Sequence, residues 1–158
     1  MAHVRHNSGN NEWYTPPWII ESARQVMGSI DLDPASCEEA NKIVQAKQFY
    51  TDGLNNPWYG WVWLNPPYAR GLVDKFMDKT ISELDNIEQI MILVNNATET
   101  KWFQKILPYM DSICLLNKRV RFWPNKSSPL QGQVIMYRGQ GNFREEFTNH
   151  GHILTCSA

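Results

Sequence analysis

The sequence has few of the residues that form covalent or metal-based cross-links. It contains three cysteines, Cys37, Cys114 and Cys156, and no two of them are close along the chain. An odd number of widely spaced cysteines favours neither a disulfide framework nor a Cys-x-x-Cys metal site, and it fits a reducing compartment. We expect His150 and His152 to be solvated rather than bound to a metal. The sequence therefore predicts no structural metal and a cytoplasmic location.

Long apolar runs are also absent, and none approaches the roughly 18 residues that a membrane-spanning helix requires. Residues 1–12 are polar and contain no hydrophobic core of a secretory signal. At 158 residues and 42% hydrophobic content, the chain has the size and composition of one globular domain. We expect a flexible tail over residues 1–12, a folded domain over residues 13–140 and a C-terminal tail over residues 141–158.

The net charge of −1 conceals two regions of opposite sign. Residues 1–100 contain seven Lys and Arg against thirteen Asp and Glu, whereas residues 101–158 contain eight basic residues against three acidic ones. A basic region can approach phosphates, and an acidic region avoids them or binds a cationic ligand. An asymmetry of this size also arises by chance, so both interpretations stay open at this point.

Apolar periodicity predicts helices that alternate with strands. The expected helices span residues 18–27, 36–44, 71–84 and 99–110, and the expected strands span residues 29–33, 48–50, 61–64, 89–94 and 112–116. This alternation predicts an α/β domain with a largely parallel sheet. Within residues 61–64, Trp61 and Trp63 share one face of the strand, which is most simply the core face. Residues 120–123 and 133–137 flank a polar loop and predict an antiparallel hairpin at the C-terminal end.

The tetrapeptide Asn65-Pro66-Pro67-Tyr68 directly follows the predicted strand 61–64. Ligands of open α/β sheets bind beyond the carboxyl ends of the strands, so we expect this tetrapeptide at the mouth of a cleft. Two consecutive prolines fix φ and remove two N–H groups, which leaves the Asn65 side-chain carbonyl and the Pro66 carbonyl as rigid acceptors. With the flat ring of Tyr68, they match a planar group that bears an NH₂. A plain turn is the alternative, because Asn-Pro is a turn signal.

This tetrapeptide resembles the catalytic motif of S-adenosylmethionine-dependent amino-methyltransferases, which act on adenine N6, cytosine N4 or a glutamine amide. Further segments are together similar to the phage-type Dam family of DNA N6-adenine methyltransferases. These segments are residues 12–17, 31–36, 50–54, Trp58, 119–122 and 128–129. The resemblance covers about residues 12–138. It implies a Rossmann-like S-adenosylmethionine-dependent methyltransferase fold in a minimal single domain, DNA as the partner, and action in the cytoplasm of a bacterial host.

The resemblance also implies roles for individual residues. The target base would be held by Asn65, Pro66, Pro67 and Tyr68. S-adenosylmethionine would be bound by Trp13, Tyr14, Thr15, Pro16, Asp31, Asp33, Pro34, Ala35 and Asp52. A carboxylate after the first strand would offset the positive charge of the cofactor's sulfonium. The alternatives from the residues alone are an acidic turn for Asp31 and Asp33, and a plain turn for Asp52.

The basic end of the chain supplies the candidate DNA contacts, which are Lys118, Arg119, Arg121 and Lys126. Among them lie Phe122 and Trp123, and Gln131 or Gln133 is a candidate for reading an adenine edge. A solvated hairpin with ordinary surface charges is the alternative.

One departure keeps other functions open. Many methyltransferases have Gly-x-Gly in their first motif, whereas residues 33–36 of this chain contain no glycine. The alternative functions are methylation of another planar amide or amine (an RNA base, cytosine N4 or a protein glutamine) and DNA binding without catalysis.

Overall fold

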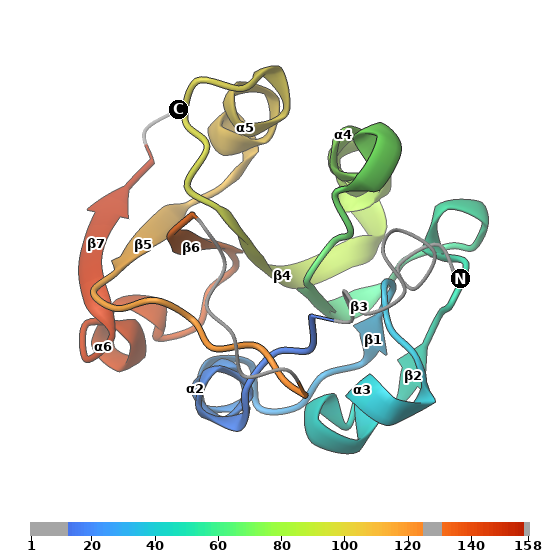
Figure 1. Cartoon of the computed structure of the whole chain (residues 1–158), viewed down its shortest axis with the longest axis horizontal. Helices are drawn as coiled ribbons and strands as arrows, with labels where there is room; N and C mark the ends of the chain where they lie inside the picture. The colour runs from blue at the N-terminus through green and yellow to red at the C-terminus, as the bar shows by residue number, and fades with distance from the viewer. Residues whose placement is uncertain (1–12, 125–130, 157–158) are drawn as a thin grey trace.

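The computed structural model describes residues 13–124 and 131–156, so the predicted tail over residues 1–12 and the candidate DNA contact Lys126 lie outside the described residues. The described residues form a seven-stranded sheet in the order β2-β1-β3-β4-β6-β5-β7. Helices α4 and α5 lie over one face of this sheet, and α2, α3 and α6 lie over the other (Figure 1). The strands are β1 Leu32–Asp33, β2 Gln48–Phe49, β3 Gly60–Leu64, β4 Ile87–Asn95, β5 Ser112–Leu116, β6 Gln133–Arg138 and β7 Gly151–Thr155. The α-helices are α2 Pro17–Met27, α3 Glu38–Val44, α4 Leu72–Glu83, α5 Lys101–Ile106 and α6 Phe143–Phe147, and the 3-10 turns are η1 Gly53–Asn55, η2 Ala69–Gly71, η3 Leu84–Asn86 and η4 Leu107–Tyr109.

The sheet has a parallel part and an antiparallel part. Strands β2, β1, β3 and β4 are parallel, whereas β6 runs antiparallel to β4 and β5, and β7 runs antiparallel to β5. The predicted α/β fold, with a parallel core and antiparallel strands from the C-terminal part, is therefore confirmed. Because β1, β3, β4 and β5 all point the same way, the segments that follow them all leave from the end of the sheet where the carboxyl ends of these strands lie.

Successive side chains of a strand point to opposite faces of the sheet, and a hydrophobic core lies on each face. In β3, Val62 and Leu64 pack in the core beneath α4 and α5. Trp63 is fully buried in the opposite core, beside α2 and α6, and Trp61 packs against that core from its rim. The prediction that Trp61 and Trp63 share one core face is thus confirmed. Burial on both faces fixes the register of β3, because a slip of one residue would exchange the two faces.

The prediction that residues 120–123 and 133–137 pair with each other as a hairpin is wrong. Strand β6 lies between β4 and β5 and pairs with both of them. Residues 120–122 form no strand; Val120 and Phe122 are buried in the core beside α2, and Trp123 forms an isolated bridge to Tyr14. The reason is burial: five of the six side chains of β6 are buried, as expected for a central strand covered on both faces.

The prediction of a tail over residues 141–158 is also wrong as far as residue 155. Residues 143–147 form α6, and residues 151–155 form the edge strand β7. Phe143 and Phe147 lie one helical turn apart and are both buried in the core beside α2. The four-residue spacing of these two phenylalanines was the signal in the sequence from which α6 could have been predicted.

Candidate active site

Two segments far apart in sequence meet at the end of β3. We call residues 13–16 the N-terminal strap. The side-chain nitrogen of Asn65 donates hydrogen bonds to the Trp13 carbonyl at 3.0 Å and to the Thr15 hydroxyl oxygen at 3.3 Å. Pro16 is the N-cap of α2, so the strap leads directly into that helix. The structure therefore brings the predicted strap and the predicted base-binding residue together.

The acidic turn, defined as residues 33–36, lies beside the same strap. The Cys37 thiol, which follows the turn, donates to the Tyr14 hydroxyl at 3.5 Å. The backbone N–H of Tyr50 donates to the Asp33 carbonyl at 3.0 Å, and the Ser36 N–H donates to the Tyr50 carbonyl at 2.9 Å. These contacts join the loop after β2 to the turn after β1.

Gly53 shows how closely this loop approaches the acidic turn. A Cβ atom at Gly53 would lie 1.9 Å from the carbonyl oxygen of Pro34, which is inside the contact distance of any two atoms. Glycine is therefore required where the loop packs on the turn.

The Asn65 amide has a defined orientation. Its nitrogen faces a backbone carbonyl, which accepts hydrogen bonds and cannot donate them, so the oxygen Oδ1 must point the other way. Among residues 13–124 and 131–156, no hydrogen bond reaches Oδ1. Pro66 and Pro67 are buried, and the chain then turns into η2 and α4. Asn65 thus offers one free acceptor oxygen at the carboxyl end of β3.

Tyr68 is held at both ends of its side chain. Its hydroxyl accepts a hydrogen bond from the Asn95 backbone N–H at 2.7 Å, and its ring meets the edge of Trp102 with 6.0 Å between centroids. Burial raises the pKa of the Tyr68 hydroxyl, so this group stays protonated at neutral pH. Asn95 ends β4 and Trp102 lies on α5, so Tyr68 joins the end of β3 to its neighbouring elements.

Asp33 is a carboxylate held in a site that disfavours its charge. It is only 3% exposed, and its Oδ1 accepts the Ala35 N–H at 3.2 Å. Burial raises the pKa of Asp33 to about 7, although hydrogen bonds from Ala35 and from the Ser36 side chain act in the opposite direction. A cationic ligand would compensate this lost hydration, so Asp33 fits a positively charged cofactor.

Asp31 and Asp52 have other contacts. Asp31 precedes β1, and its side chain lies beside the first residues of β3. Its Oδ2 accepts the Trp61 N–H at 2.9 Å and its Oδ1 pairs with Lys47 at 3.1 Å. Asn65 lies at the far end of β3, on the order of 13 Å away at about 3.3 Å per residue. Asp52 is exposed, and its two carboxylate oxygens accept the Asn55 side-chain amide at 2.9 and 3.1 Å. Among the predicted acidic residues, Asp33 is therefore the one whose surroundings suit a cofactor.

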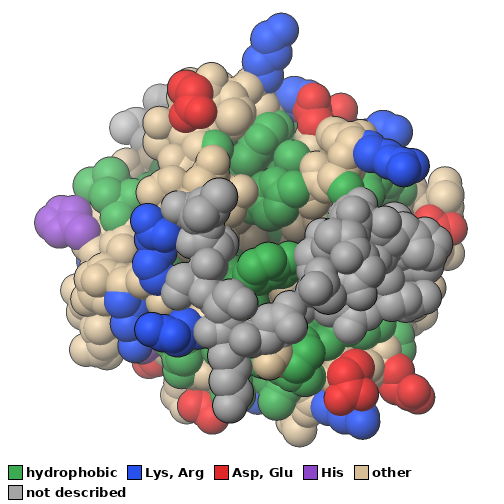
Figure 2. Space-filling model, in the orientation of Figure 1, with side chains coloured by type: hydrophobic (Ala, Val, Ile, Leu, Met, Phe, Trp, Pro, Cys, Tyr) green, Lys and Arg blue, Asp and Glu red, His purple; other side chains and the backbone are tan. Residues whose placement is uncertain are grey.

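The segment from residue 117 to residue 124, called the basic segment, lies along the strap. The side chains of Lys118, Arg119 and Arg121 are exposed, whereas Val120 and Phe122 are buried. Lys118 also lies 4.4 Å above the ring of Trp18. Figure 2 shows Lys and Arg side chains gathered at the left of this face, beside a hollow in which hydrophobic side chains are visible. Three of the four predicted DNA contacts are thus exposed basic residues of one segment.

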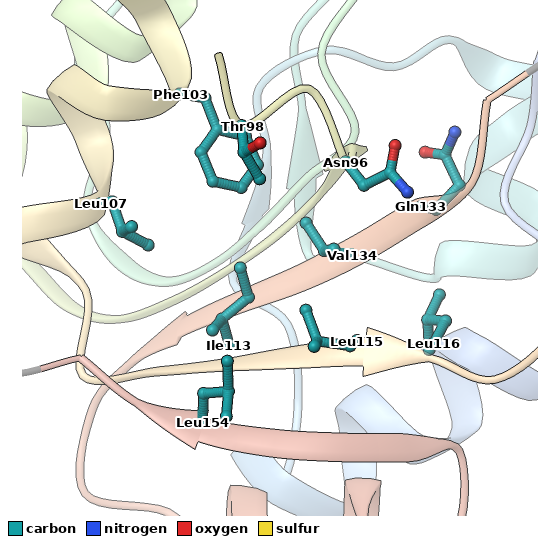
Figure 3. Close-up of a pocket in the computed structure, with 10 residues that line it drawn as sticks. All are labelled: Asn96, Thr98, Phe103, Leu107, Ile113, Leu115, Leu116, Gln133, Val134 and Leu154. Carbon is teal, nitrogen blue, oxygen red and sulfur yellow. The ribbon is translucent and has the colours of Figure 1, made fainter. Parts of the chain in front are cut away.

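A pocket of about 350 Å³ lies between α5, the segment that follows β4, and the strands β5, β6 and β7 (Figure 3). Its lining residues are mostly apolar and comprise Asn96, Thr98, Phe103, Leu107, Ile113, Leu115, Leu116, Gln133, Val134 and Leu154. Gln133 is 5% exposed, and its side-chain nitrogen donates to Asn95 Oδ1 at 2.7 Å. Asn95 in turn contacts Tyr68, so hydrogen bonds join one end of this pocket to the candidate active site.

Within residues 13–124 and 131–156, no group of three or more His, Cys, Asp or Glu residues could hold a metal ion. None of the helices in these ranges is long and apolar enough to cross a membrane.

Comparison with known proteins decides the family. A family model described as DNA N-6-adenine-methyltransferase (Dam) matches residues 3–139. The chain belongs to this Dam family. It is also 38% identical over 96 residues to a DNA N-6-adenine-methyltransferase of Escherichia phage T1. That match covers 58% of this chain and 38% of the phage protein, so the chain spans well under half the length of this relative.

Sequence reasoning about this Dam-family chain missed three contact residues. Asn95 holds Tyr68, Trp102 packs on its ring, and Trp123 donates its indole N–H to the Thr15 carbonyl at 3.1 Å. Asn95 follows an apolar strand just as Asn65 does, and this parallel was a usable signal. Trp102 and Trp123 had none, because their contacts depend on how distant segments fold together.

Proposed function

We propose that this protein transfers a methyl group from S-adenosylmethionine to the exocyclic N6 of adenine in DNA. Membership of the Dam family and the likeness to the phage T1 protein support this activity. The observation that carries it is the Asn65 amide, whose nitrogen is bound by the strap while its oxygen is free to accept.

The reaction requires acceptors for the amino hydrogens of the base. The N6 lone pair of adenine is delocalised into the ring, which makes N6 a poor nucleophile. Asn65 Oδ1 and the Pro66 carbonyl would accept its two hydrogens and draw the lone pair back onto N6. The same two oxygens would stabilise the positive charge that develops on N6 during transfer, as preorganised dipoles do in other enzymes.

Adenine inside a duplex is out of reach of these oxygens, so we infer that the base is turned out of the helix. The ring of Tyr68 is the candidate stacking surface, because its hydroxyl is bonded to Asn95 and its ring packs against Trp102. Stacking of a base on an aromatic ring contributes on the order of 1–3 kcal/mol. The basic segment would contact the phosphates through Lys118, Arg119 and Arg121.

The residues present fit S-adenosylmethionine at the acidic turn. When bound, this cofactor supplies a methyl group on a positively charged sulfur. Asp33 would offset positive charge, because burial opposes its ionisation when no cation is near. Trp13, Tyr14 and Pro16 of the strap, together with Pro34 and Ala35, would form the walls of the same site. We infer that the protein acts in the compartment that holds its DNA, the cytoplasm of a bacterial host.

The activity is tested by incubating the protein with S-adenosylmethionine carrying a labelled methyl group and with unmethylated DNA, followed by nucleoside analysis. We expect the label in N6-methyladenine. Label in 4-methylcytosine, in RNA or in protein would identify a different acceptor and contradict the proposal. Failure to bind the cofactor in calorimetry would contradict the proposal and favour the alternative of DNA binding without catalysis.

A variant tests the role of Asn65. Asn65→Ala removes the acceptor oxygen, so we expect methyl transfer to fall by at least about 100-fold, the effect of losing one preorganised group at a reacting centre. Cofactor affinity measured by calorimetry should change little, since Asn65 is assigned to the base. A fully active Asn65→Ala variant would show that the assignment of the base-binding oxygen is wrong.

A further inference from the structure

The side-chain amide of Asn65 can adopt two orientations, and the position of its backbone does not determine which one it takes. The terminal torsion of asparagine is soft, and a half-turn exchanges the amide oxygen and nitrogen. In one orientation Oδ1 is free to accept, and in the other Nδ2 takes its place and presents donors to a substrate amine. Only the first orientation can accept a hydrogen from an amino group.

The Trp13 carbonyl selects the first orientation because it can only accept, and the Thr15 hydroxyl adds a second hydrogen bond that holds it. The Trp13 carbonyl lies 3.0 Å from Asn65 Nδ2, and the Thr15 hydroxyl oxygen lies 3.3 Å from the same atom. An amide nitrogen carries two hydrogens, so these two contacts can occupy both. If the amide were turned, Oδ1 would face the carbonyl oxygen of Trp13 and that contact would become repulsive.

The strap is itself fixed by the end of the basic segment. Tyr14 and Trp123 exchange two backbone hydrogen bonds of 3.0 and 3.1 Å. The indole N–H of Trp123 donates to the Thr15 carbonyl at 3.1 Å, and Thr15 is only 4% exposed. These bonds hold the backbone of Thr15 where its hydroxyl oxygen lies 3.3 Å from Asn65 Nδ2.

We propose that Thr15 is a positioning residue that, with the Trp13 carbonyl, fixes the Asn65 amide so that Oδ1 faces the substrate amine. This inference rests on the proposed methyl transfer to an amino group. It differs from the role in cofactor binding that the family resemblance implies for Thr15. A positioning role predicts a change in the rate of transfer, whereas a cofactor contact predicts a change in cofactor affinity.

The decisive variants are Thr15→Val and Thr15→Ser. Valine has nearly the shape of threonine and lacks the hydroxyl, so we expect kcat to fall about fivefold to tenfold, the equivalent of one hydrogen bond. The Kd for S-adenosylmethionine and the KM for DNA should stay within about twofold on the same scale. Thr15→Ser keeps the hydroxyl, and we expect it to restore most of the rate.

Thr80→Val is the matched control. Thr80 is fully buried in α4, and its hydroxyl donates to the Phe76 carbonyl at 2.8 Å, away from the strap. The same substitution there should leave kcat of the folded protein unchanged. Equal losses of kcat in Thr15→Val and Thr80→Val, or a loss of cofactor affinity with unchanged kcat in Thr15→Val, would overturn the positioning role.

A measurement without turnover separates this inference from the proposed function. In NMR spectra, the side-chain amide hydrogens of Asn65 should exchange with solvent more slowly in the wild type than in Thr15→Val. Wild-type protein that transfers no methyl group would refute the proposed function. Equal exchange rates in the two proteins would refute the positioning role, whatever the activity.

Discussion

We expect Asp33 to make stability and cofactor affinity respond to pH in opposite directions. Its carboxylate is 3% exposed, and burial raises its pKa from 3.8 to about 7. Because its folded pKa is higher than its unfolded pKa, ionisation is harder in the folded protein. The cost of folding with an ionised Asp33 is absent below about pH 4, grows as the pH rises and levels off above about pH 7.

The substitution Asp33→Asn removes this cost while it keeps an acceptor oxygen for the Ala35 N–H. A shift of one pKa unit corresponds to about 1.4 kcal/mol, so the relief is about 2 kcal/mol at pH 5 and about 4 kcal/mol at pH 8. Any loss from changed hydrogen bonds applies at both pH values. The increase in relief between them, about 2 kcal/mol, is therefore the quantity that tests the reasoning.

The assay is urea denaturation of wild type and Asp33→Asn at pH 5 and pH 8, without cofactor. We expect the variant to gain free energy of unfolding relative to wild type as the pH rises. Calorimetry should show the complementary effect, since wild-type affinity for S-adenosylmethionine should weaken as Asp33 protonates below about pH 7. A difference between the two proteins that does not change with pH would refute a buried, ionisable Asp33.

Two further predictions separate structural from functional charges. Asp31→Asn loses the ion pair with the exposed Lys47 and should lower the free energy of unfolding by no more than about 1 kcal/mol, with cofactor affinity in calorimetry unchanged. A large loss of cofactor affinity in Asp31→Asn would show that Asp31 does belong to the cofactor site. Arg121→Ala should weaken DNA binding and reduce the slope of log affinity against log salt by about 1, measured by fluorescence anisotropy. An unchanged slope would show that Arg121 makes no phosphate contact.

The sequence predicted the parallel half of the fold and the position of Asn65, because local patterns determine both. A β-prone run followed by Asn-Pro-Pro-Tyr needs no distant partner to end a strand. The partner of β6 and the fold of residues 143–155 depended on strand order, and strand order is set by packing between distant segments. Burial on both faces of β6 shows why an edge hairpin was the wrong arrangement.

Asp31 and Asp33 illustrate the same limit within the site. Both precede Pro34, and their spacing gives no reason to prefer one. The pairing of β1 with β3 brings Asp31 to Trp61, and a Cβ at Gly60 would lie 2.4 Å from Asp31 Oδ2. That contact leaves Asp33 as the buried carboxylate at the turn. The sequence could not show which residues Thr15 and Asn95 hold in place, because Asn65 and Tyr68 lie 50 and 27 positions away from them.

The direction of β5 has a consequence for how new specificities arise. Leu116 ends β5 and Gln133 begins β6, and both lie at the end of the sheet where β3 finishes and Asn65 follows. The chain between them leaves and returns at this end, so a segment added after Trp123, beyond the buried Val120 and Phe122, need not alter the strands or the strap. Doubling the length of a flexible loop costs only about 0.6 kcal/mol in closure entropy. For the proposed methylation of DNA, recognition can therefore diversify by insertion at this point while the strands and the strap that hold Asn65 stay constant.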